Sequence, residues 1–115
     1  CWDLVGGAVE EGESLLGALR REIHEETGWE LRRVLTALPP RTWEADGRCH
    51  TEYDWVVEVR GDLSAPRLEP GKHTRHAWLG PADLAPLHAD AARTGSTFIV
   101  DSVTAAHRWL AAALR

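Results

Sequence analysis

The sequence predicts a mixed α/β domain, and two observations lead to this fold class. Segments with the alternating pattern of strands interleave with segments of helical spacing, and the chain of 115 residues has the length of one compact domain. The chain is 43% hydrophobic and 27% charged, which excludes disordered, collagen-like and coiled-coil proteins. No apolar run approaches the roughly 18–20 residues of a membrane span. We therefore expect a single domain over residues 1–115.

A first helix is expected over residues 15–27. Ser14 is a favourable N-cap residue before it, and Gly28 is a favourable C-terminal stop. Three apolar residues at helical spacing should face the core, and His24 should be solvated. The predicted core-facing residues are Leu16, Leu19 and Ile23.

Strands and loops follow from alternation and from turn residues. Residues 1–5 are expected to end a strand, and Gly6, Gly7 and Gly12 to frame a loop. Further strands are expected over residues 34–38, 51–59 and 76–79, with loops over residues 39–50 and 65–72. A helical turn is expected over residues 82–87, and a last helix from Ser96 or Thr97 to the end. Trp55 and Trp78, on expected strands, should belong to the core.

The cysteines and the first residue bear on compartment and completeness. Cys1 and Cys49 form no Cys-x-x-Cys pair, which argues against a disulfide or zinc framework and favours the reducing cytoplasm. The chain begins with Cys rather than Met and shows no signal peptide. We expect a domain that lacks its N-terminal strand or strands.

The negative charge is concentrated near the N-terminus. Residues 1–30 carry eight acidic and two basic residues, a net charge of −6, although the whole chain carries only −5. An acidic surface that served solubility alone would be spread over the chain. A local concentration favours a cation site.

Three glutamates of the expected helix share one face. Glu22, Glu25 and Glu26 have the spacing i, i+3, i+4, and their face borders the apolar stripe. Each such like-charge pair costs about 0.2–0.5 kcal/mol in an isolated helix, and Arg21, four residues before Glu25, is the only relief at that spacing. Converging carboxylates are hard ligands suited to Mg²⁺ or Mn²⁺. Without the surrounding pattern, a solvated acidic face would be the favoured interpretation.

The surrounding pattern resembles the box of the Nudix (MutT-like) hydrolase family. Its fixed positions are occupied by Gly7, Glu13, Arg21, Glu22, Ile23, Glu25, Glu26 and Gly28, with Trp29 as the bulky end. Eight specified positions over 23 residues form a highly specific signal. Trp2-x-Leu4 and residues 77–84 are also similar to the family. The resemblance implies an α/β/α sandwich with a mixed β-sheet.

The resemblance also implies an activity and a site. Family members are metal-dependent pyrophosphohydrolases that cleave the diphosphate bond of a nucleoside diphosphate linked to another moiety. The implied metal ligands are Glu22, Glu25, Glu26 and the carbonyl of Gly6; Arg21 orients the glutamates, Glu13 braces the loop, and Gly7 and Gly28 make turns. Mg²⁺ is the expected cofactor, with Mn²⁺ as an alternative.

The general base is less closely defined by the resemblance. Some members use a glutamate of the box, and others use a glutamate in the loop before the last strand. In that loop, Lys72 or His73 stands where related sequences often have Glu, which leaves Glu69 as the nearby acid. Glu52 is another candidate. We expect a box glutamate to supply or share the role, and the expected residues are Glu22 or Glu25.

Substrate contacts are expected outside the box. Trp43 and Tyr53 are candidates to stack on a nucleobase, and Arg41 and Lys72 are candidates to meet phosphates, although isolated basic residues are usually plain surface. The expected partner is a small nucleoside diphosphate derivative. Scattered basic residues argue against polymeric nucleic acid, no membrane partner is expected, and a homodimer is left open. The competing hypothesis is a catalytically silent Nudix-fold module that senses a ligand.

Overall fold

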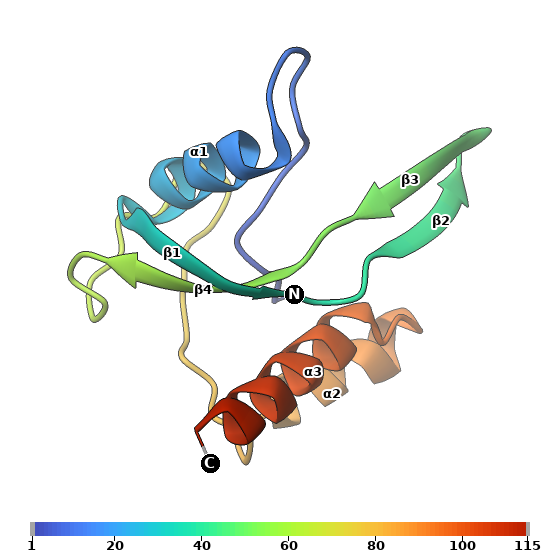
Figure 1. Ribbon diagram of the computed structural model, residues 1–115. Coiled ribbons are helices and arrows are strands. Elements are labelled where there is room, and N and C mark those ends of the chain that lie inside the picture. The colour runs from blue at the N-terminus through green and yellow to red at the C-terminus, as the bar shows by residue number, and fades with distance from the viewer. Residues whose placement is uncertain (1, 115) are drawn as a thin grey trace. The chain divides into compact units, whose positions relative to one another are not determined.

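The computed structural model describes residues 2–114, and helices and strands interleave along the chain as predicted (Figure 1). The elements are α1 (Leu15–Thr27), β1 (Glu30–Ala37), β2 (Arg41–Ala45), β3 (Arg48–Glu52), β4 (Trp55–Arg60), α2 (Ala85–Thr94) and α3 (Phe98–Ala113). β1 pairs with β4 in one two-stranded sheet, and β2 pairs with β3 in another. Between residues 2 and 114, no helix has the length and apolar character needed to cross a membrane.

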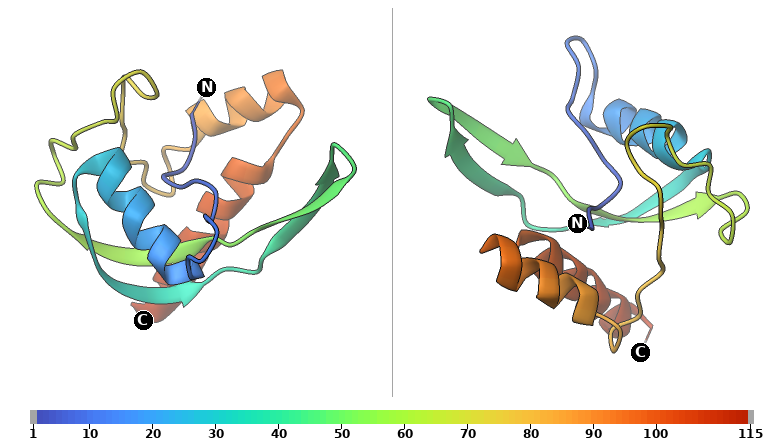
Figure 2. Two further views of the ribbon diagram at one scale, coloured as in Figure 1. Left: turned by 90° about the horizontal axis from the view of Figure 1, so that it is seen from above. Right: turned by 180° about the vertical axis from the view of Figure 1, so that it is seen from behind.

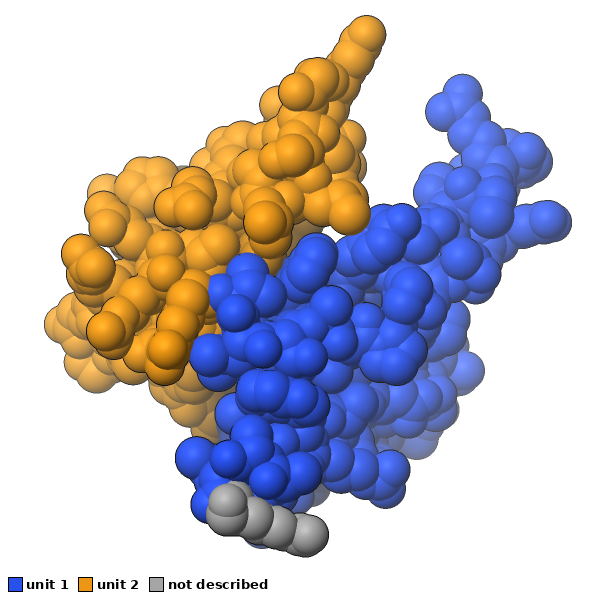
Figure 3. All heavy atoms as spheres, in the orientation of Figure 1, with its two compact units in different colours: residues 1–2, 34–56, 79–115 blue, residues 3–33, 57–78 orange. Residues whose placement is uncertain are grey.

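The chain divides into two compact units. Unit 1 comprises residues 1–2, 34–56 and 79–115, and unit 2 comprises residues 3–33 and 57–78 (Figure 3). Strands β1 and β4 contribute residues to both units. The single-domain expectation stays a prediction.

Helix α1 of unit 2 has the predicted bounds. The Ser14 hydroxyl accepts a hydrogen bond from the Gly17 N–H, and Gly28 adopts a left-handed φ of 73°. Its buried residues are Ala18, Glu22, Ile23, Glu26 and Thr27. Leu16, predicted to face the core, is instead 49% exposed, so that part of the prediction is wrong. The buried face is displaced from the leucines toward the glutamates.

Two tryptophans of unit 2 stack on each other. The ring centroids of Trp29 and Trp78 lie 5.5 Å apart, and their indole N–H groups donate to the carbonyls of Asp62 and Leu63. Trp78 is nevertheless 62% exposed, so its predicted core position is wrong. Residues 76–79 form no strand either, since Trp78 is held by the loop carbonyl and by Trp29 rather than by a strand ladder.

Unit 1 contains a β-hairpin that the sequence analysis assigned to a loop. β2 and β3 pair antiparallel, with Trp43 opposite His50, and Asp46 and Gly47 form the turn at φ values of 53° and 72°. An Asp-Gly pair with both φ angles positive is favoured in tight hairpin turns. The predicted strand over residues 51–59 is also interrupted, because β3 ends at Glu52 and β4 begins at Trp55.

The core of unit 1 lies where α2 and α3 pack against each other (Figures 1 and 2). Leu84, Leu87 and Val100 are buried there, and the partly buried Trp2 packs against them. The last helix is confirmed, whereas the expected turn over residues 82–87 leads into a full helix. The expected strand ending at residue 5 does not form in the described residues 2–5, and residue 1 lies outside them.

Candidate active site

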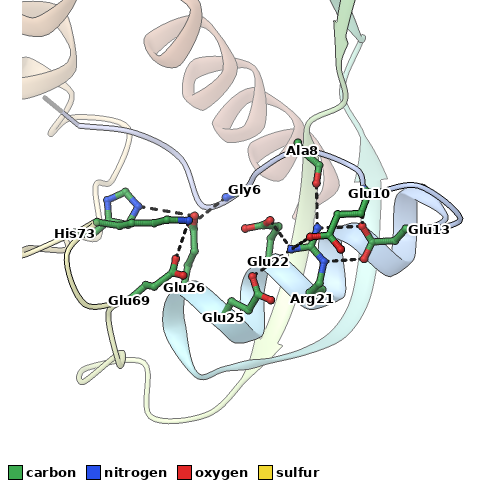
Figure 4. Close-up of polar contacts among 11 residues, drawn as sticks. Gly6, Ala8, Glu10, Glu13, Arg21, Glu22, Glu25, Glu26, Glu69 and His73 are labelled. Carbon is green, nitrogen blue, oxygen red and sulfur yellow. Dashed lines mark hydrogen bonds and ion pairs between the residues drawn. The ribbon is translucent and has the colours of Figure 1, made fainter.

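Arg21 of α1 ties the preceding loop to the helix (Figure 4). Its Nε and Nη2 donate to the two carboxylate oxygens of Glu13 at 2.7 and 3.0 Å, and Nη2 also donates to the Ala8 carbonyl at 3.0 Å. Its Nη1 donates to Glu22 at 2.7 Å and to Glu25 at 3.1 Å. One planar guanidinium therefore fixes the loop and orients two of the three box glutamates.

Glu13 is the strongest partner of Arg21. The paired hydrogen bonds from Arg21 lower the pKa of the Glu13 carboxyl to about 2, and the Glu10 N–H, which donates to Glu13 at 3.0 Å, acts in the same direction. Conversely, the hydrogen bonds to Glu13 and then Glu22 raise the pKa of Arg21. These contacts support the loop-bracing role that the family resemblance implies for Glu13.

The depressed pKa of Glu13 predicts a pH-dependent stability. Because the pKa of Glu13 falls from an ordinary 4.5 to about 2 on folding, its contribution is present above about pH 4.5 and is lost as the pH falls to about 2. Glu13→Gln should flatten the pH dependence of the urea midpoint in this window. Glu11→Gln, at an exposed acid of the same loop, is the control. An unchanged pH profile for Glu13→Gln would contradict the assignment.

Gly7 makes room for Glu22. The Glu22 side chain is only 12% exposed, and a Cβ at Gly7 would lie 2.4 Å from its Oε1 and 2.5 Å from its Cδ. Carbon and oxygen atoms without a bond do not approach this closely. The absence of a side chain at residue 7 is therefore a steric requirement of the buried carboxylate.

Gly7→Ala is accordingly expected to displace either the loop or Glu22. We expect the hydrolysis that the family resemblance implies to fall by at least about tenfold, because misplacement of a catalytic group by about 1 Å is costly. Gly6→Ala is the matched control, since a Cβ at residue 6 meets no atom within 4 Å and the substitution keeps the backbone N–H that donates to Glu26 and the backbone carbonyl. Equal activity of the two variants would show that the contact with Glu22 is unimportant.

Glu26 is the most buried of the three box glutamates. Its side chain is 8% exposed; it accepts the Gly6 N–H at 3.1 Å and lies 3.8 Å from Nε2 of His73. Burial raises the pKa of Glu26, and nearby Glu22 and Glu69 act in the same direction, whereas the Gly6 N–H and His73 oppose the rise. The environment therefore leaves the negative charge of Glu26 incompletely balanced.

The oxygen donors of α1 fit a hard divalent cation. The bonds to Arg21 use one oxygen of Glu22 and one of Glu25, which leaves the second oxygen of each for a cation beside Glu26. In residues 2–114 no group of three or more His, Cys, Asp or Glu side chains already has the spacing of a metal site. The ligand set of Glu22, Glu25, Glu26 and the Gly6 carbonyl therefore stays a prediction.

The loop of residues 69–73 lies beside Glu26. The backbone N–H groups of Lys72 and His73 donate to the Glu69 carbonyl, and the Lys72 Nζ lies 3.3 Å from Oε2 of Glu69. His73 turns toward Glu26 (Figure 4). The sequence predicts a loop over residues 65–72 but no contact between Glu26 and His73, because no spacing rule relates residues so far apart in the chain.

The remaining candidates lie in unit 1. Arg41 is committed to Glu52 and Asp54, and its guanidinium lies 4.4 Å from the centre of the Phe98 ring. The expected phosphate contact of Arg41 and the candidacy of Glu52 as the base stay predictions. Trp43, 38% exposed, stacks on His50 at 5.4 Å between centroids, and Tyr53 is 46% exposed. Both aromatic residues stay candidates for contact with a base.

Comparison with known proteins agrees with the pattern of the box. Residues 1–99 match the family model described as NUDIX domain. The chain is 36% identical to nucleoside triphosphatase NudI of Escherichia coli O17:K52:H18, and 49% identical to the NudI proteins of Escherichia coli O139:H28 and Shigella flexneri. These alignments cover 72% of this chain and 64% of each relative, so the chain spans somewhat under two thirds of their length. No solved structure matches significantly.

Proposed function

The chain belongs to the Nudix family, and on this premise we propose that it is a divalent-metal-dependent hydrolase of phosphoric anhydrides, which cleaves the diphosphate bond of a nucleotide derivative. The observation that carries the proposal is the arrangement of Arg21, which joins Glu13 of the loop to Glu22 and Glu25 of the helix. Glu26 of the same helix adds a buried carboxylate, and a bound cation would stabilise its negative charge.

The residues divide the chemistry between them. A divalent cation, when bound, would neutralise phosphoryl oxygens and lower the pKa of a bound water. We expect one of Glu22 and Glu25 to bind the cation, and the other to accept the proton of the attacking water with the oxygen that Arg21 does not hold. The water then forms one P–O bond while the bridging P–O bond breaks and the second phosphate leaves. Arg21 holds one oxygen of each carboxylate, so that the other oxygen stays directed away from the guanidinium. Glu69, beside Glu26, is the second candidate for the base.

The substrate class that we propose first is a nucleoside triphosphate. The relatives at 36% and 49% identity carry the name nucleoside triphosphatase. A nucleoside triphosphate also contains the diphosphate bond that the family chemistry requires. ADP-ribose, NADH, dinucleoside polyphosphates and nucleotide sugars are the alternatives to compare with it.

The test is a substrate panel with product masses. The protein is incubated with each compound and with Mg²⁺, Mn²⁺ or a chelator, and the products are identified by mass spectrometry. We expect metal-dependent cleavage of at least one nucleoside triphosphate. Stabilisation of the protein against thermal unfolding by a nucleotide, without product under any metal condition, would instead favour the silent ligand-sensing module.

A further inference from the structure

Lys72 is the only lysine of the chain, and it stands in the loop beside the box helix. Its Nζ lies 3.3 Å from Oε2 of Glu69, and its side chain is 62% exposed. Two contacts attach the loop to α1: the Arg67 N–H donates to the Thr27 carbonyl at 2.8 Å, and Nε2 of His73 lies 3.8 Å from a carboxylate oxygen of Glu26. The lysine is thus carried on a segment that contacts α1 itself.

The surroundings keep Lys72 charged. The hydrogen bond and charge of Glu69 raise its pKa, and the more distant charges of Glu22 and Glu26 raise it further. An ammonium has three N–H donors and can rotate them independently. The contact with Glu69 occupies one direction, and the exposed side chain leaves donors for a ligand.

A positive side chain beside α1 would add to the charge that a bound divalent cation offers the phosphates of a nucleotide. Its phosphates are negatively charged, and so is the helix face of Glu22, Glu25 and Glu26 that would meet them. Arg21 is already engaged by Glu13, Glu22, Glu25 and the Ala8 carbonyl. Lys72 carries a positive charge close enough to Glu22 and Glu26 to feel their charges, and the N–H donors that do not contact Glu69 are available to a ligand.

We propose that Lys72 is a substrate-binding residue whose ammonium contacts a phosphoryl oxygen of the nucleotide bound at α1, and that Glu69 is the positioning residue that holds it there. This inference rests on the proposed function and adds to it a residue that binds the phosphates of the substrate. The ordinary alternative is a solvated lysine that contacts no ligand.

The first experiment uses the single lysine as a chemical probe. The protein is treated with pyridoxal 5′-phosphate and borohydride, and labelling of Lys72 is measured by peptide mass spectrometry with and without inorganic triphosphate. We expect triphosphate with Mg²⁺ to slow labelling of Lys72 at least about fivefold, while Mg²⁺ alone leaves the labelling rate unchanged. Equal labelling rates at Lys72 with and without triphosphate would overturn the proposal.

The second experiment separates binding from turnover. Lys72→Gln should raise KM for the nucleoside triphosphate roughly tenfold, because about one charge-assisted hydrogen bond is lost. The substitution should change kcat less than about threefold. Lys72→Arg should restore most of the affinity, and Glu69→Gln should raise KM less than Lys72→Gln does. An unchanged KM in Lys72→Gln would assign the lysine to plain surface.

Arg93→Gln is the matched control. Arg93 is a 60% exposed cation paired with Asp90 three residues before it, as Lys72 is paired with Glu69, but it lies on α2 in unit 1. Its loss should leave KM unchanged. If triphosphate protects Lys72 from labelling but no compound is hydrolysed, the phosphate contact is supported and the proposed function is refuted. If a nucleotide is hydrolysed but Lys72 is not protected and Lys72→Gln leaves KM unchanged, the proposed function is supported and the phosphate contact is refuted.

Discussion

Glu26→Gln is expected to lower metal-dependent hydrolysis by at least about a hundredfold, the scale seen when one preorganised electrostatic contact is removed from an active site. The amide keeps the shape of the side chain and can still accept the Gly6 N–H, but it removes the charge that would bind the cation. Because burial raises the pKa of Glu26, the ionised carboxylate disfavours folding at neutral pH in the absence of metal. The metal-free variant should therefore melt no lower than the parent protein.

The measurement combines initial rates, a Mn²⁺ binding titration and thermal unfolding without metal. Activity and Mn²⁺ affinity should both fall while the melting temperature is kept. Glu11→Gln removes an exposed carboxylate of the same loop and should change none of the three quantities. Hydrolysis by Glu26→Gln at the parental rate would remove this carboxylate from the site.

Arg21→Gln is expected to have the second largest effect, a fall in hydrolysis of about a hundredfold or more together with a lower melting temperature. The substitution leaves Glu13, Glu22 and Glu25 without their common counter-charge and frees the loop at Ala8. Arg21→Lys should recover little, because a single ammonium cannot reproduce the two-pronged contact with Glu13.

The neighbouring Arg20 provides the control for Arg21. Arg20 is exposed on the same helix, and Arg20→Gln removes the same charge and should leave hydrolysis and melting near the parental values. The double variant Arg21→Gln, Glu13→Gln tests the pairing, since removal of both partners should destabilise the protein less than the two single effects add up to. Strict additivity would show that the two side chains act independently.

The helix of the box could be predicted from the sequence because its determinants are local. Ser14 and Gly28 mark its ends through hydrogen bonds that span no more than four residues, and the structure confirms both. The side of the helix that is buried depends instead on the loop that covers it. Leu16 is consequently exposed, whereas Glu22 and Glu26 are buried.

The hairpin and the tryptophans show where local patterns were insufficient. The strands on either side of Asp46 and Gly47 are mostly exposed, so they lack the apolar alternation that identifies a strand. Only the turn residues indicated the hairpin. Trp78 was predicted to be buried from its residue type, but its environment is set by Trp29 and the Leu63 carbonyl, which are distant in sequence. The contact between His73 and Glu26 was invisible for the same reason.

The Arg21 contacts have one further property, their short reach along the chain. Arg21 bonds partners that lie at most 13 residues away, and the Gly6 N–H reaches Glu26 across 20 residues. Contacts of low sequence separation cost little chain entropy to close, so these contacts can form early in folding. If the proposed function holds, substitutions in the distal loops can alter substrate contacts without disturbing the contacts of Arg21.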